Sequence, residues 1–219
     1  IFIVFNLLGW FKPGTNERRY KEAFIFVPRK SGKSLFVAAL SLALGFLERR
    51  SGSTIYITAA ALKQSAETFD KIIYTLRVKG VIDEFRVRDN NAEHSISKTF
   101  LDDKGIPVGS IHIEAMAANP DRQDSFGCNI CIADEIHAYK SAAQYNRFKE
   151  AMKAYTNKLM IGITTAGDNV NSFCYGRLQY AEKILDGIVK DDTLFCFVSK
   201  AEKDNNGDVD FLDPKQHEL

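Results

Sequence analysis

The chain has 219 residues, with 29 Lys plus Arg against 28 Asp plus Glu and a formal net charge of +1. Its 45% apolar and 26% charged residues are typical of a globular domain and exclude a disordered chain or a collagen-like repeat. No run approaches 18 consecutive apolar residues, so we expect no membrane-spanning helix. The first residue is not Met, and we expect a fragment of a longer protein. Four cysteines without a secretory signal predict reduced thiols in a cytosolic compartment.

The first half of the chain alternates strand-like and helix-like segments. Apolar runs predict a strand at 23–27, a helix at 35–47, a strand at 54–58 and a helix at 62–78. Such alternation is typical of a parallel sheet covered by helices. Residues 84–114 differ, because polar and apolar side chains alternate there, and this pattern predicts antiparallel strands at the edge of the sheet.

The second half returns to the alternating pattern. It predicts a strand at 129–133, a helix at 142–154, a strand at 159–163, a helix at 170–185 and a strand at 193–198. The polar tail that follows is typical of a linker. We therefore predict one α/β domain over residues 1–200 and the start of a linker over residues 201–219.

The loop after the first predicted strand has the features of a phosphate-binding loop. It reads Pro28-Arg29-Lys30-Ser31-Gly32-Lys33-Ser34, and Gly-Lys-Ser between a strand and a helix is the core of the P-loop pattern. Backbone N–H groups and the helix N-terminus bind phosphate, Lys33 would reach the β and γ phosphates, and the Ser34 hydroxyl would bind Mg²⁺. Val27 replaces the usual first glycine, so a surface turn remains an alternative.

Two carboxylates follow the strand predicted at 129–133. In a parallel sheet the carboxyl ends of the strands share one side with the ligand-binding loops, which would bring Asp134 and Glu135 to the P-loop. Asp134 would then hold Mg²⁺ through water, and Glu135 would act as the general base toward the attacking water. The alternative is a solvated acidic turn.

A small polar segment, Thr164-Thr165-Ala166-Gly167, follows the strand predicted at 159–163. Its hydroxyl groups are candidates for sensing the γ-phosphate and passing that signal onward. A turn that merely ends the strand is the competing interpretation.

These three motifs, in this order, resemble the ATPase domain of the tailed-phage terminase large subunit. The resemblance also covers Arg18-Arg19-Tyr20 upstream and Ile136-His137-Ala138 and Cys174-Tyr175 downstream. It implies an α/β P-loop NTPase of the ASCE, RecA-like type, with a mostly parallel central sheet flanked by helices and an antiparallel edge extension. It further implies an ATP-hydrolysing motor that moves double-stranded DNA into a capsid.

The family also implies the cofactors, partners and location of such a motor. These are ATP and Mg²⁺, double-stranded DNA, the portal protein, the small terminase subunit and further copies in a ring, in the host cell cytoplasm and without a membrane. The family's nuclease domain follows the ATPase domain, so we expect no nuclease activity in this fragment.

The resemblance assigns roles residue by residue. Lys33, Glu135 and Arg29 would be catalytic, Arg29 as a phosphate contact or as an arginine finger in cis. Thr164, Thr165 and Gly167 would form the coupling motif, and Gln64 is a weaker match to a family glutamine. Arg122 is the candidate arginine finger acting in trans, with an ordinary loop arginine as the alternative.

Two other functions stay open. Residues 134–137 read Asp-Glu-Ile-His, as in one half of a DExH-type helicase, which would need a second RecA-like domain. A regulatory ATP-binding module without turnover is the non-enzymatic alternative, and Glu135 argues against it. Cys128 and Cys131 are interpreted as buried thiols rather than zinc ligands or a redox pair. Trp10, Phe11 and Tyr20 either pack on adenine or belong to the core.

Overall fold

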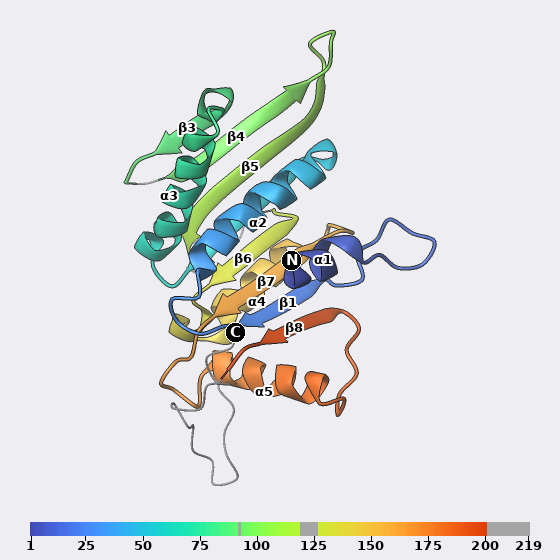
Figure 1. The fold of residues 1–219 in the computed structure, drawn as a ribbon, viewed down its shortest axis with the longest axis vertical. Coiled ribbons are helices and arrows are strands. Elements are labelled where there is room, and N and C mark those ends of the chain that lie inside the picture. The colour runs from blue at the N-terminus through green and yellow to red at the C-terminus, as the bar shows by residue number, and fades with distance from the viewer. Residues whose placement is uncertain (92, 119–126, 201–219) are drawn as a thin grey trace.

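The computed structural model describes residues 1–91, 93–118 and 127–200, and within them one eight-stranded sheet passes through the molecule (Figure 1). The strand order is β3-β4-β5-β2-β6-β7-β1-β8. The strands are β1 (Glu22–Phe26), β2 (Ser53–Ala59), β3 (Arg86–Asp89), β4 (His94–Leu101), β5 (Pro107–Ala117), β6 (Ile130–Asp134), β7 (Leu159–Thr164) and β8 (Leu194–Val198). Arg122 and the tail 201–219 lie outside the described residues.

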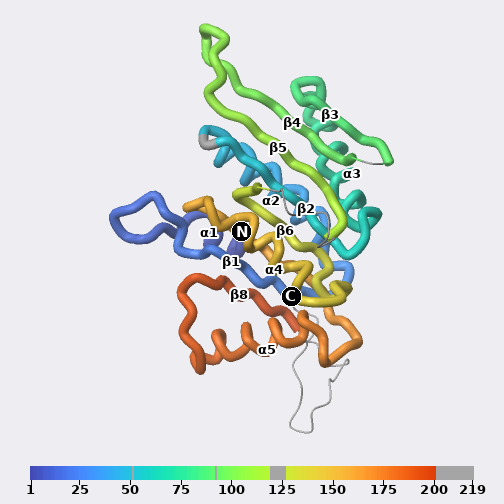
Figure 2. Tube along the Cα trace, turned by 180° about the vertical axis from the view of Figure 1, so that it is seen from behind, coloured from blue at the N-terminus to red at the C-terminus, as the bar shows by residue number. Residues whose placement is uncertain are grey.

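Helices cover both faces of this sheet, as Figures 1 and 2 show from opposite sides. The five α-helices of the described ranges are α1 (Phe2–Gly9), α2 (Lys33–Glu48), α3 (Leu62–Val78), α4 (Ala142–Ala151) and α5 (Phe173–Leu185), and short 3-10 turns include η4 (Ile136–Ala138). The apolar side chains of α1, α2 and α3 pack on one face, and those of η4, α4 and α5 pack on the other. The predicted α/β layering is therefore confirmed.

The strand residues alternate between the two cores. In β1, Ala23 and Ile25 face the core with α2 and α3, whereas Phe24 and Phe26 face the core with α4 and α5. All five residues of β1 are buried, which explains why the sequence reads as a continuous apolar run. Cys128 and Cys131 are buried free thiols, as predicted, and burial raises the pKa of Cys128 to about 12.

The edge extension is antiparallel, as the alternating sequence predicts. β4 runs antiparallel to both of its neighbours, β3 and β5. β5 also pairs with β2 in parallel, so this eleven-residue strand joins the extension to the parallel part of the sheet. Figure 1 shows the connection between β4 and β5 projecting beyond the helices.

The helices differ from the sequence-based expectation at several boundaries and in one additional helix. α2 begins at Lys33 rather than at 35, and α4 ends at Ala151 rather than at 154. α5 begins at Phe173 rather than near Val170, because Ser172 caps it by accepting a hydrogen bond from the Tyr175 N–H. α1 was not predicted; it is short, apolar on nearly all sides and has no side-chain cap.

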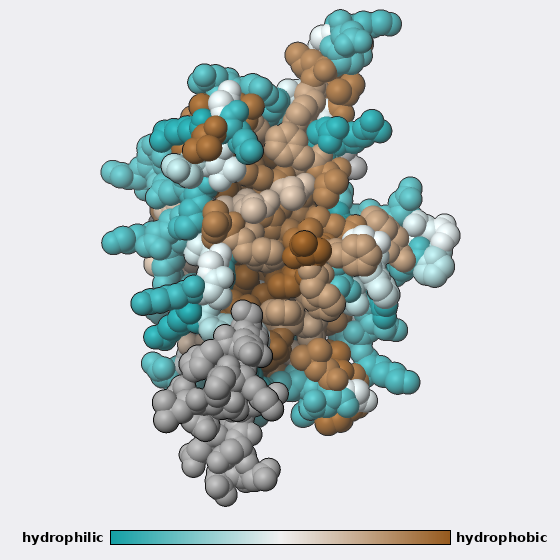
Figure 3. Space-filling view, in the orientation of Figure 1, coloured by the Kyte–Doolittle hydropathy of each residue, from teal (hydrophilic) through white to brown (hydrophobic). Residues whose placement is uncertain are grey.

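One face of the molecule carries exposed apolar side chains. Figure 3 shows a brown band across this face, and the strongly exposed apolar residues of α1 and α2 include Phe2, Phe5, Leu35 and Leu47. In the part of the chain that the structure describes, no helix combines the length and the apolar character needed to cross a membrane.

Candidate nucleotide site

The carboxyl ends of three neighbouring parallel strands create the site. β7 lies between β1 and β6, with Phe26 opposite Thr164 and Asp134 opposite Ile163. The three strands therefore end side by side, and the residues that follow each of them gather at one end of the sheet. The Val27 N–H donates to the Thr164 carbonyl (3.1 Å), which fixes the start of the loop after β1.

The loop after β1 turns sharply into α2. Gly32 is the N-cap of α2 and has φ 79°, in the left-handed region that a side chain disfavours. Lys30 also has a positive φ, 65°. The N–H groups in the first turn of α2 have no partner within the helix, and this is the arrangement that binds phosphate.

The acidic pair meets the P-loop lysine at this end of the sheet. Lys33 Nζ forms an ion pair with Asp134 Oδ1 and lies 3.0 Å from Glu135 Oε1. Asp134 is 2% exposed and also accepts from the Glu135 N–H (2.8 Å) and, over 3.5 Å, from the Thr68 hydroxyl of α3. The predicted meeting of P-loop and carboxylates is present in the structure.

Burial and charge act in opposite directions on the two carboxyl groups. Burial raises the pKa of Asp134, and the nearby Lys33 only partly opposes it. Burial also works to raise the pKa of Glu135, but His137 and Lys33 together lower it to about 2. The Glu135 carboxyl group is therefore ionised at neutral pH.

His137 connects Glu135 to the last residue of β7, Thr164. Its Nδ1 lies 3.1 Å from both Thr164 Oγ1 and Glu135 Oε2, and its backbone N–H donates to Thr164 Oγ1 (3.1 Å). Only the contact with Thr164 has hydrogen-bond geometry, so Glu135 Oε2 is buried without a hydrogen bond to any described residue. A Cβ on Gly167 would lie 2.9 Å from His137 Cβ, so a side chain at position 167 would displace His137.

A cavity of about 540 Å³ opens over these groups. Most of the predicted site residues line it: Pro28, Arg29, Lys30, Gly32, Lys33, Ser34, Glu135 and Thr165. Gln64, also noted in the sequence, lines it together with Leu35, Lys71 and His137. Asp134 and Thr164 are buried behind the wall, and Ser31 and Gly167 do not line it.

The cavity differs from the sequence-based expectations in a few respects. Arg122 cannot be placed, because it lies outside the described residues. Trp10, Phe11 and Tyr20 do not line the cavity; Tyr20 packs edge-on against Phe195 instead.

The chain matches one protein-family model over most of its length. Residues 1–183 match the model of the family described as "Terminase large subunit, ATPase domain". The chain belongs to this family. The terminase ATPase domains are P-loop NTPases, so the predicted fold class is confirmed together with the resemblance.

Relatives of known structure have the same terminase fold. The large terminase of bacteriophage HK97 superposes with a TM-score of 0.68 at 20% identity, over 84% of this chain and 36% of its own. The large terminase of a thermophilic bacteriophage, solved in complex with ADP, gives 0.60 at 13% identity, over 88% of this chain and 43% of its own. Protein YmfN of Escherichia coli K12 is 32% identical over 92 residues, which are 42% of this chain and 19% of YmfN. The chain thus spans less than half the length of each of these three proteins.

The donors of this terminase cavity fit a nucleoside triphosphate with Mg²⁺. Arg29, Lys30 and Lys33 supply cationic groups where phosphates would lie, beside the amino-terminal turn of α2. The Ser34 hydroxyl and the Asp134 carboxylate are oxygen ligands of the kind that Mg²⁺ prefers. The buried Glu135 Oε2 lacks a hydrogen bond within the described residues and could accept one from a water molecule.

The sequence did not identify three residues at this terminase site. Thr68 reaches Asp134, and its only signal is a hydroxyl within the otherwise mostly apolar buried stripe of α3. His137 belongs to the family-like run 136–138 and to a helicase-like pattern, but neither assigns it a role, although its Nδ1 lies beside both Glu135 and Thr164. Lys71 lines the cavity, but a lysine on the border of a helix stripe carries no distinguishing signal.

Proposed function

We propose that this chain is the ATP-hydrolysing motor domain of a terminase large subunit, which couples hydrolysis to the translocation of double-stranded DNA into a capsid. The observation that carries the proposal is the contact of Lys33 with Asp134 and Glu135 at the cavity. Each of these groups has a defined task in phosphoryl transfer, and the lysine and the carboxylates come from different strand ends. Family membership supports the same activity.

Each residue of the site has its own role in the proposed reaction. Residues 28–34 bind the phosphates, and Lys33 exchanges its carboxylate partners for the β and γ phosphates when ATP enters. The Glu135 carboxylate accepts a proton from water while the water oxygen bonds to the γ phosphorus and the bond to the ADP oxygen breaks. Ser34 and Asp134 would hold Mg²⁺, which supplies positive charge to the phosphate oxygens. Arg29, in the P-loop, adds further charge to the phosphates.

We assign coupling to movement to the end of β7 and the residues that follow it. Thr164 accepts from His137, which lies beside Glu135, so loss of the γ-phosphate at Glu135 is transmitted to β7 by direct contacts. Thr165 lines the cavity, and Gly167 leaves room for His137. These three residues form the proposed coupling motif.

The cofactors, partners and location of this motor domain are proposed from the family. It comprises ATP and Mg²⁺, DNA, the portal protein, the small terminase subunit and a ring of copies, in the host cell cytoplasm. The ADP complex of the thermophilic-phage terminase supports a nucleotide in this cavity. We also propose that the ATPase domain spans residues 1–200 and that residues 201–219 begin a linker toward a nuclease domain.

ATP turnover measured across a range of protein concentrations tests this function, with Glu135→Gln as the control. We expect turnover that rises more than linearly with concentration and disappears in the variant, because a neighbouring subunit completes the site. Linear turnover that disappears in the variant would place the arginine finger in cis, at Arg29. ATP binding without any turnover would favour the regulatory module, and turnover that persists in the variant would remove Glu135 from the proposal.

Arg122 is proposed as the finger contributed by the neighbour. Arg122→Ala should then abolish the more-than-linear part of the turnover and leave ATP binding unchanged. An assembled motor with wild-type DNA-stimulated ATPase in this variant would eliminate Arg122 as the finger.

A further inference from the structure

Helix α3 forms a third wall of the cavity, in addition to the P-loop and the acidic pair. Gln64 and Lys71 both line the cavity, and Thr68 lies between them on the same helix. Spacings of four and three residues bring these side chains to one face of α3. The helix therefore presents a polar row to the site, next to the apolar stripe that it buries in the core.

One member of this row already contacts the candidate catalytic machinery. The Thr68 hydroxyl is fully buried and lies 3.5 Å from Asp134 Oδ2. Asp134 pairs in turn with Lys33. This end of the cavity is where the terminal phosphate of a bound triphosphate would lie, because the Lys33 ammonium and the Glu135 carboxylate meet there.

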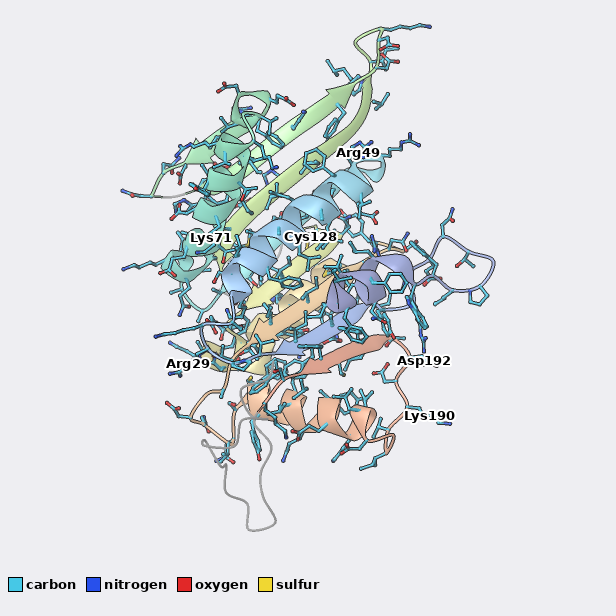
Figure 4. The ribbon with its side chains drawn as sticks, viewed as in Figure 1. Arg29, Arg49, Lys71, Cys128, Lys190 and Asp192 are labelled. Carbon is cyan, nitrogen blue, oxygen red and sulfur yellow. The ribbon has the colours of Figure 1, made fainter. Side chains whose placement is uncertain are left out.

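Lys71 lies one turn after Thr68 on α3. Its ammonium group donates to the Glu67 carbonyl (3.0 Å), one turn back on its own helix, and forms no ion pair with any residue that the structure describes. The ammonium of Lys33, in contrast, is held between two carboxylates. Figure 4 shows Lys71 on α3 and Arg29 in the loop after β1 along the same side of the molecule.

We propose that Lys71 binds the terminal phosphate of a nucleoside triphosphate and so makes the cavity prefer triphosphates to diphosphates. The proposal rests on the proposed function, since it requires a nucleotide in this cavity. A lysine ammonium on a flexible stem is suited to this task, because it can leave a backbone carbonyl for a charged oxygen at small cost. It also gives α3, which follows β2 directly, a contact that exists only before hydrolysis.

Two lysines on the same helix provide a matched experiment. Lys63 lies on α3 and does not line the cavity, so Lys63→Ala removes the same charge from the same helix without touching the site. Affinities for a slowly hydrolysed triphosphate analogue and for ADP are measured by calorimetry on the purified wild type, Lys71→Ala and Lys63→Ala. Lys71→Ala should weaken binding of the triphosphate analogue by about tenfold, as expected for one charge-assisted hydrogen bond, and change ADP binding by less than about twofold.

A conservative variant and the remaining outcomes complete the test. Lys71→Arg, which keeps the positive charge, should recover most of the lost affinity for the triphosphate analogue. Equal losses for the analogue and ADP, equal losses in the two alanine variants, or no loss at all would each overturn the role of Lys71. A wild type that binds neither nucleotide would instead refute the proposed function, so the two failures are distinguishable.

Discussion

Two carboxylates lie at opposite ends of the strands, the buried Glu22 and the half-buried Glu135, and their environments differ. Glu22 begins β1 at the amino-terminal end of the strand. Its Oε1 accepts from the Tyr145 hydroxyl (2.8 Å) and from Arg177, and its Oε2 accepts from Lys149 (2.6 Å). Each oxygen of Glu22 is therefore satisfied, by side chains of α4 and α5 that join these helices to the sheet.

Glu135 follows β6 at the other end and is less fully satisfied. Its Oε1 meets Lys33, whereas Oε2 has no hydrogen bond within the described residues. Its φ is 53°. Within the described ranges, Lys30 is the one other non-glycine residue with a positive φ. A left-handed backbone costs about 1–3 kcal/mol and persists where the surrounding structure enforces it.

The difference distinguishes a stabilising carboxylate from a reactive one. The donors around Glu22 hold helices in place, so its removal should be felt in the free energy of unfolding. The strained backbone of Glu135 does little for stability, and its Oε2, which has no hydrogen bond within the described residues, can accept one from water.

Glu135→Gln should give the largest effect, and on turnover alone. The amide cannot accept the water proton, so ATP turnover should fall by roughly 1000-fold, within the range that removal of a general base produces. Steady-state phosphate release measures this loss. Nucleotide affinity should stay within a few-fold of the wild type, because the P-loop is unchanged.

The stability of the same variant completes the comparison. The free energy of unfolding of Glu135→Gln in urea should lie within about 1 kcal/mol of the wild type, as for a substitution that leaves packing intact. A loss of several kcal/mol would show that Glu135 is a structural carboxylate like Glu22, and the contrast would fail.

Glu22→Ala should produce the converse result. It leaves the Tyr145 hydroxyl and the Arg177 guanidinium without their acceptor in a buried environment, at a cost of about 3 kcal/mol, the lower end for such losses because Lys149 is partly exposed. Urea unfolding measures the change. The folded fraction should bind nucleotide normally, since Glu22 lies at the opposite end of β1 from the P-loop. An unfolding free energy within about 1 kcal/mol of the wild type would contradict this interpretation.

Much of the candidate site is predictable because it depends on short motifs and on one rule of parallel sheets. The P-loop and Asp134-Glu135 each follow an apolar run, and the shared carboxyl end of the strands brings them together. Continuous apolar strands likewise predict the parallel part of the sheet. The alternating pattern predicts the antiparallel extension.

The remaining site residues depend on tertiary packing. Thr68 reaches Asp134, and Lys71 lines the cavity, only because α3 packs beside α2, and no local pattern specifies that placement. The contact of His137 with Glu135 depends on the left-handed turn at Glu135, which the sequence does not reveal because glutamate rarely adopts it. α1 has neither caps nor an amphipathic pattern, so its helical state follows from burial of residues such as Leu7.

The pH dependence of turnover provides the finest test of the contrast. His137 and Lys33 hold the pKa of Glu135 at about 2, so in the wild type this base stays ionised from pH 8 down to pH 5. His137→Ala removes one of the two stabilising partners, and burial then raises the pKa of Glu135. Because protonated Glu135 cannot act as a base, kcat/KM of the variant should fall toward pH 5 by up to about tenfold relative to wild type, since kcat/KM reports the free enzyme.

Two further variants separate this effect from a general loss of structure. His137→Asn retains a polar nitrogen near Glu135 Oε2 and should bring the acid limb of kcat/KM back toward that of the wild type. His112→Ala removes a histidine that lies 3.2 Å from Glu114 on β5, away from the cavity, and should leave the pH profile unchanged. If the profiles of His137→Ala and the wild type are parallel, His137 does not tune Glu135. Its contact with Thr164 would then be its remaining role, and the carboxylate would owe its low pKa to Lys33 alone.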